Sequence, residues 1–188
     1  MSPDPTDLPT PVDDGAADHL PGLRLPPIAL PSTDGTDVRL DLPPQDADRL
    51  VVYAYPRTGV PGEEPLTPDW DEIPGARGCT PESCGFRDHH DDLRAAGAAV
   101  VGLSTQDTPY QREMVQRLDL PYPVLSDRDL VATRALRLPT FEAAGQTLLR
   151  RLTLVISDGA VEHVFYPVFP PDRHAAEVRE WLRATQGR

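Results

Sequence analysis

Apolar residues along this chain follow two periods, one typical of strands and one typical of helices. Continuous apolar runs at residues 50–55 and 98–104 have the length and the β-branched content of buried strands. Two further apolar stretches, residues 147–157 and 160–166, flank an Asp-Gly dipeptide and predict a hairpin. A shorter hairpin is predicted within residues 23–42, around the turn sequence Ser-Thr-Asp-Gly.

Helices are predicted between and after these strands, where apolar side chains recur at steps of three and four residues. They cover residues 81–96, 108–118, 127–136 and 172–185. The first is expected to have Thr80 as its cap and Pro81 in the first position, and to end at Gly97. The second is expected to have Thr108 as its cap and Pro109 in its first turn.

The order of these elements predicts an α/β protein. Alternating strands and helices are typical of a three-layer α/β/α sandwich, here with a central mixed sheet and an N-terminal hairpin. A length of 188 residues suits one domain with a sizeable core. Residues 1–20 are rich in Pro, Asp and Gly without apolar periodicity, so we expect a disordered acidic leader there and a folded domain over residues 21–188.

Composition excludes several classes of function. The formal net charge of -12 and the isoelectric point of about 4.7 argue against nucleic acid or an anionic membrane as a partner, since both require a basic face. The basic residues are all Arg, which excludes Schiff-base and Walker-type lysine chemistry. The sequence contains no signal-like stretch and no apolar run of membrane-spanning length, which predicts a cytoplasmic protein.

Cys79 and Cys84 are the only cysteines, and they flank the start of the first predicted helix. A thiol at the positive end of a helix dipole, with Arg77 two residues away, is expected to favour its thiolate form, which is a nucleophile. The alternative is that both are small apolar core residues. A capped, electropositive helix start favours a redox site over a core position.

The residues around the cysteines carry a family resemblance. The run from Gly78 to Asp88, Gly-Cys-Thr-Pro-Glu-Ser-Cys-Gly-Phe-Arg-Asp, resembles the active-site helix of peroxiredoxins, in particular the bacterioferritin-comigratory (PrxQ) group. Similar stretches follow in the order of that family at residues 51–56, 100–105, 123–127 and 151–156. The resemblance covers residues 22–184 and implies a thioredoxin-like fold, with which the predicted order of elements is compatible.

The resemblance also implies roles for particular residues. Cys79 matches the peroxidatic cysteine and Cys84 the resolving cysteine, which together form an intramolecular disulfide. Arg151 matches the arginine beside the peroxidatic sulfur, whereas Arg150 faces the other side of the strand. The implied substrate is hydrogen peroxide or an organic hydroperoxide, and the implied reductant is a thioredoxin-like dithiol. No metal or organic cofactor is expected, and the protein is expected to be a monomer or a weak homodimer.

One feature departs from the family pattern. Peroxiredoxins carry Thr or Ser three residues before the peroxidatic cysteine, where this chain has Ala76. Residues 59–75 form a Pro- and Gly-rich stretch too long for the compact loop of the family, and they are interpreted as an insertion. Thr58, just before the insertion, is the candidate to supply the missing hydroxyl. If it does not, the peroxide pocket is built differently from that of the family.

Two other hypotheses involve the same cysteines. A non-enzymatic redox sensor, or another thiol-disulfide protein of the thioredoxin fold, would use the cysteine pair without peroxide turnover, and the sequence does not separate these from an enzyme. A copper-handling protein of the Sco type requires three residues between its cysteines and a His ligand, which do not match here. Steady-state peroxide consumption distinguishes the enzyme from the sensor.

Overall fold

The computed structural model describes residues 8–42 and 44–187. Its strands are β1 (Ala29–Pro31), β2 (Asp37–Arg39), β3 (Arg49–Ala54), β4 (Ala98–Ser104), β5 (Val124–Ser126), β6 (Thr140–Ala143), β7 (Gln146–Leu149), β8 (Leu152–Ser157) and β9 (Ala160–Phe165). Its α-helices are α1 (Cys79–Asp88), α2 (His90–Ala95), α3 (Thr108–Leu118), α4 (Val131–Leu136) and α5 (His174–Ala184), and short 3-10 helices include η2 (Trp70–Glu72) and η3 (Pro171–Arg173).

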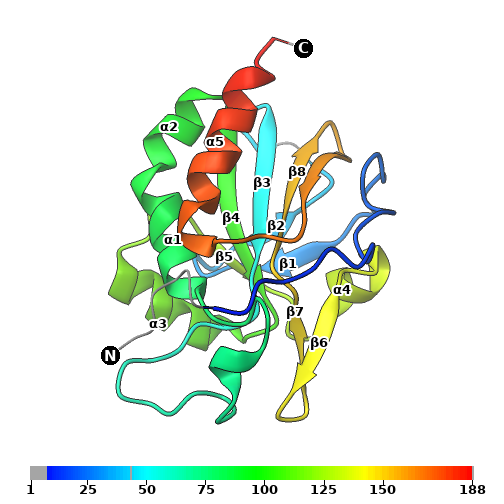
Figure 1. Ribbon diagram of the computed structural model, residues 1–188. Helices are drawn as coiled ribbons and strands as arrows, with labels where there is room; N and C mark the ends of the chain where they lie inside the picture. The colour runs from blue at the N-terminus through cyan, green and yellow to red at the C-terminus, as the bar shows by residue number, and fades with distance from the viewer. Residues whose placement is uncertain (1–7, 43, 188) are drawn as a thin grey trace.

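The central sheet has the strand order β5-β4-β3-β8-β9. β3, β4 and β5 are parallel, whereas β8 and β9 are antiparallel to their neighbours, so the sheet is mixed as predicted. Helices α1, α2 and α5 cover one face, and α4 and the β1–β2 hairpin cover the other (Figure 1). The three-layer α/β fold and the N-terminal hairpin are therefore confirmed.

β3 divides the core between the two faces, because successive side chains of a strand point to opposite sides. Val51, Tyr53 and Tyr55 pack with side chains of α1, α2 and α5, including Phe86 and Leu93. The alternate residues of β3 belong to a second cluster, with side chains of the hairpin and of α4: Leu50, Val52, Ala54, Ile28, Leu40 and Leu136. Burial on both faces explains why this strand is almost continuously apolar.

The predicted strand over residues 147–157 is two strands in the structure. β7 pairs with β6, which was not predicted, and β8 pairs with β3 in the central sheet. The break falls at Arg150 and Arg151, where the Arg150 amide donates to the Pro139 carbonyl oxygen at 2.8 Å. The chain therefore changes sheets at this arginine pair, which periodicity alone does not predict.

The predicted helix over residues 81–96 begins earlier and is interrupted. α1 begins at Cys79 after Gly78, so Thr80 is not the cap, and His89 separates α1 from α2. Gly78 has a φ of 108°, and a Cβ at this position would lie 2.3 Å from Pro171 Cγ. Only glycine fits this left-handed approach to η3. Gly97, at a φ of 80°, follows α2 as predicted.

Two other helices begin at residues that differ from the prediction. α3 is capped by Asp107 rather than Thr108, and the Asp107 carboxylate accepts from the Tyr110 amide at 2.9 Å. α4 begins at Val131 rather than at residue 127. Asp127 instead accepts hydrogen bonds from two amides of the first turn of α4. In both cases an aspartate carboxylate, a strong acceptor, determines where the helix starts.

The expected disordered leader is partly ordered. Residues 1–7 lie outside the described part of the chain, but residues 8–20 pack along the domain. Ala17 and Leu20 are buried in the core cluster that also contains α4. His19 Nε2 lies 2.9 Å from the Leu136 carbonyl oxygen, and the Tyr166 hydroxyl donates to Asp14 at 2.8 Å. In the described residues, none of the helices has both the length and the apolar character needed to cross a membrane.

Candidate active site

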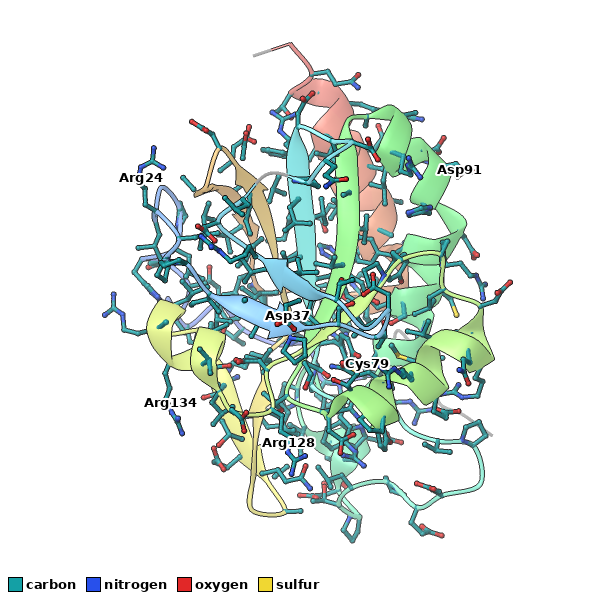
Figure 2. The ribbon with its side chains drawn as sticks, turned by 180° about the vertical axis from the view of Figure 1, so that it is seen from behind. Arg24, Asp37, Cys79, Asp91, Arg128 and Arg134 are labelled. Atoms are coloured by element: carbon teal, nitrogen blue, oxygen red, sulfur yellow. The ribbon has the colours of Figure 1, made fainter. Side chains whose placement is uncertain are left out.

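Cys79 is the first residue of α1, and its side chain is enclosed by protein. Only 3% of the residue is exposed. Figure 2 labels Cys79 among the side chains. The Arg151 Nη2 atom donates to Cys79 Sγ at 3.2 Å, and the thiol donates to the Ala76 carbonyl oxygen at 3.6 Å. The sulfur therefore has a cationic donor on one side and a backbone acceptor on the other.

Arg151 is fixed by the turn that leads into α1. Its Nη2 atom donates to three consecutive carbonyl oxygens, those of Gly75, Ala76 and Arg77, at 3.2, 3.4 and 3.2 Å. Arg150 instead donates to the Thr140 carbonyl oxygen at 3.1 Å. The structure thus brings Arg151, and not its neighbour, to the sulfur.

Glu82 is a site residue that the sequence reasoning missed. It is fully buried and forms an ion pair with Arg151 Nη1. The available signal was its spacing, because residues three apart in a helix share a face and Glu82 lies three residues after Cys79. A buried carboxylate in this position needs a cation, which Arg151 provides.

The charges of Arg151 and Glu82, together with burial, determine the protonation state of the Cys79 sulfur. Burial raises the pKa of the Cys79 thiol, and Glu82 raises it further, whereas the Arg151 guanidinium lowers it. Burial also raises the pKa of Glu82, again opposed by Arg151. Because Arg151 and Glu82 already balance each other, a thiolate adds an unbalanced charge to a buried site. The net direction for Cys79 is a raised pKa, which differs from the expected thiolate preference.

Arg77 does not contribute as expected. Its side chain forms an ion pair with Asp71, which lies in η2 of the insertion. The guanidinium that lowers the pKa of Cys79 is that of Arg151. Closeness in sequence was misleading because the Arg77 side chain is directed to the insertion.

Cys84 is half-buried and belongs to the same helix as Cys79. Both thiols are free. Residues five apart in a regular helix have Cα atoms about 8 to 9 Å apart, and a disulfide requires less than about 7 Å. The two cysteines therefore cannot be bridged while α1 remains intact.

Thr58 is buried, and it lines the same cavity as Cys79. Its amide donates to Gln106 Oε1 at 3.2 Å, its hydroxyl lies 3.5 Å from the same oxygen, and its carbonyl oxygen accepts from the Tyr110 hydroxyl. Ala76 occupies the position of the family threonine, and its carbonyl oxygen accepts from the Cys79 thiol. The structure thus places Thr58 at the cavity wall, with its hydroxyl directed to Gln106.

A cavity of about 460 Å³ opens at Cys79. Its wall combines the start of α1, the start of η3, the insertion and the first described residue of the chain, and includes Leu8, Arg57, Trp70, Pro81 and Pro171. No group of three or more His, Cys, Asp or Glu side chains suited to holding a metal ion occurs in residues 8–42 and 44–187. The arrangement supports thiol chemistry on a substrate that enters through the cavity.

Comparisons with known proteins agree with this geometry. A family model described as Redoxin matches residues 20–181. Chloroplastic peroxiredoxin Q of Suaeda salsa is 29% identical over 163 residues, which make up 87% of this chain and 67% of that protein. Peroxiredoxin Bcp of Escherichia coli is 29% identical over 162 residues, 84% of this chain and 92% of that protein. The crystal structure of peroxidoxin BcpB from Mycobacterium tuberculosis superposes with a TM-score of 0.71 at 27% identity, covering 89% of this chain and 99% of that one.

Proposed function

The chain belongs to the Redoxin family, and because its relatives there are peroxiredoxins of the Q and Bcp type, we propose that it reduces hydroperoxides with Cys79 as the peroxidatic residue. The single observation that carries this assignment is the 3.2 Å contact from Arg151 Nη2 to Cys79 Sγ at the end of an open cavity. The substrate is hydrogen peroxide or an organic hydroperoxide.

The first step is attack of the Cys79 thiolate on the terminal peroxide oxygen. The S–O bond forms as the O–O bond breaks, so the sulfur becomes a sulfenic acid and the peroxide leaves as water or an alcohol. Negative charge develops on the leaving oxygen. Arg151 and the free amides at the start of α1 are the donors available to stabilise that charge.

Formation of the thiolate depends on Arg151. The Cys79 thiol donates a hydrogen bond to the Ala76 carbonyl oxygen in the resting site, and burial raises the pKa of this thiol. Arg151 opposes that effect, because a guanidinium does not lose its charge and favours the nearby anion. The guanidinium therefore serves both the nucleophile and the leaving oxygen.

The second step is condensation of the Cys84 thiol with the Cys79 sulfenic acid. This reaction releases water and forms the Cys79–Cys84 disulfide, which a thioredoxin-like dithiol then reduces by thiol–disulfide exchange. Because both cysteines lie on one chain, no second subunit is required, which supports a monomer or a weak homodimer. Two free thiols that must be reduced again in each cycle support action in the cytoplasm.

Serine variants of the two cysteines test the assignment. Cys79→Ser is expected to abolish peroxide reduction, because a hydroxyl is not ionised near neutral pH. Cys84→Ser is expected to complete one turnover to the sulfenic acid and then to stop cycling with thioredoxin. Labelling with a dimedone probe locates the sulfenic acid, and labelling of Cys84 in the Cys79→Ser protein would reverse the two roles.

A non-enzymatic redox sensor would use the same two cysteines without peroxide turnover. Peroxide consumption in the presence of thioredoxin, its reductase and NADPH separates the two functions. An enzyme consumes many equivalents of peroxide per chain, whereas a sensor stops after one.

A further inference from the structure

A second chamber of about 300 Å³ adjoins the cavity at Cys79. The two spaces share a common wall, which consists of Arg57, Thr58, Gly59, Trp70, Asp71 and Arg77. Cys79 lines only the first space, and Val60, Leu66 and Tyr110 line only the second. The second chamber therefore adjoins the cavity that contains the reacting sulfur but is not itself lined by Cys79.

The insertion over residues 59–75 forms most of the wall of this second chamber. Trp70, at the start of η2, lines both spaces, so its indole stands where the two meet. The ion pair between Asp71 and Arg77 joins the insertion to the turn just before Cys79. The residue next to Trp70 thus contacts the turn that leads to Cys79.

The chamber is too large to serve hydrogen peroxide alone. A water molecule occupies about 30 Å³ of liquid, so a peroxide of about twice that size leaves most of the space empty. Cavities of roughly 300 Å³ or more are typical of sites for small organic ligands. Glu63 and Glu64 also line the chamber, whereas Val60, Leu66, Trp70 and Tyr110 contribute its apolar or aromatic surface. The Arg57 guanidinium lies 4.7 Å from the centre of the Tyr110 ring.

We propose that the second chamber binds the organic group of a bulky aromatic hydroperoxide, and that Trp70 determines this specificity. This inference rests on the proposed peroxidase function. The peroxide oxygens lie at Cys79 while the ring of the substrate stacks on the indole, as offset aromatic pairs do. The sulfur loses two electrons to the peroxide, and the organic group leaves as an alkoxide that takes up a proton and departs as the alcohol.

The kinetic test compares cumene hydroperoxide with hydrogen peroxide in the full-length protein. Trp70→Ala is expected to lower the ratio of kcat/KM for cumene hydroperoxide over hydrogen peroxide by about tenfold, and Trp70→Phe by about twofold, because an aromatic ring is retained. Trp181→Phe is the matched control. Trp181 belongs to α5 and contacts Arg49 and His163, and its replacement is expected to leave the ratio unchanged. An unchanged ratio in Trp70→Ala would overturn the proposal.

A binding test measures occupancy of the second chamber independently of catalysis. In the Cys79→Ser, Trp181→Phe double variant, Trp70 is the single indole, and its emission is titrated with 2-phenyl-2-propanol, the alcohol product of cumene hydroperoxide. A saturable change that tert-butanol produces only at much higher concentration supports an aromatic site. No saturable change would exclude the chamber as the binding site, even if the protein proves to be an active peroxidase. If the variant shows saturable binding but the wild-type protein shows no peroxidase turnover, the proposed function is refuted while the binding site is retained.

Discussion

At the scale of single residues, the site depends on one buried cation shared by two acidic groups. Arg151→Met retains most of the side-chain stem but removes the charge, and it is expected to slow the reaction with peroxide by one to two orders of magnitude, roughly the loss of one charged donor. Arg151 also lowers the pKa of Cys79. Its removal raises that pKa, so the pH–rate profile is expected to move to higher pH. Stopped-flow kinetics with hydrogen peroxide across pH measure both effects.

Arg150→Met is the control for this variant, because Arg150 bonds to the β6 strand rather than to the sulfur. It is expected to leave both the rate and the profile unchanged. An Arg151→Met protein with the wild-type second-order rate constant would show that another group activates Cys79.

Glu82→Gln is expected to shift the same profile in the opposite direction. Glu82 raises the pKa of Cys79, so a neutral amide of the same shape lowers that pKa and moves the profile to lower pH. The thiolate is then more populated near neutral pH. A profile that moves to higher pH would mean that Glu82 acts chiefly by holding Arg151 in place.

At the residue scale, a sequence motif marks the position of a side chain but does not reveal whether that side chain is buried. Cys79, Cys84 and Arg151 were located from their spacing and from the strand motif, and the structure brings Arg151 to the Cys79 sulfur. The role of Glu82 is not readable from the sequence, because an exposed and a buried glutamate in a first helical turn look alike there. Its complete burial comes from packing of distant segments, which a single sequence does not reveal.

At the scale of elements, the proposed Cys79–Cys84 disulfide requires α1 to open in every catalytic cycle. Both cysteines lie within its regular turns, so part of the segment between them has to unwind before the disulfide closes. Oxidation with one equivalent of peroxide is expected to lower the helical signal in far-UV circular dichroism and to increase amide exchange in residues 80–88. Unchanged exchange in a protein that contains the disulfide would contradict the opening of α1.

Tyr122 is expected to control how readily α1 opens. Its hydroxyl donates to the Ser83 carbonyl oxygen at 2.8 Å, and the Tyr53 hydroxyl donates to Ser83 Oγ at 3.0 Å, so the turn beside Cys84 is tied to the sheet. Tyr122→Phe removes one such bond, worth roughly a two- to tenfold change in an opening equilibrium. Disulfide formation in rapid-quench experiments is expected to accelerate by that factor, with less sulfinic acid formed at high peroxide.

The control for this variant is Tyr166→Phe, which removes a hydroxyl bonded to the exposed Asp14. It is expected to leave the rate of disulfide formation unchanged. A Tyr122→Phe protein that closes its disulfide at the wild-type rate would show that the Ser83 contacts do not limit opening.

The elements were predictable where one periodicity extends over a whole segment. The runs that became β3 and β4 were predicted within one residue, because burial on both faces leaves a continuous apolar stretch. The interruption at His89 and the change of sheet after Leu149 were missed. Each break is determined by the other elements against which the segment packs. The residues of the segment itself show the same periodicity before and after the break.

At the scale of the whole molecule, the segment before the first strand contributes to stability. Leu20 is fully buried against the face of the sheet that carries α4, so Leu20→Ala is expected to lower the free energy of unfolding by about 2 to 5 kcal/mol. Val12 lies in the same segment with 78% of its surface exposed, and Val12→Ala is expected to cost almost nothing. Urea denaturation curves measure both. If the two variants change the free energy of unfolding equally, the segment does not contribute to stability and is the disordered leader that the sequence predicts.

The same segment has a consequence for handling the protein. Leu8 lines the cavity at Cys79, whereas α5 carries the chain toward its other end on the far side of the molecule (Figure 1). An affinity tag fused directly to Leu8 in place of residues 1–7 would begin at the wall of this cavity, and it would compete with peroxide or with the docking reductant. A tag after α5 leaves from the opposite end. Kinetic constants for this protein should therefore be taken from C-terminally tagged or cleaved material.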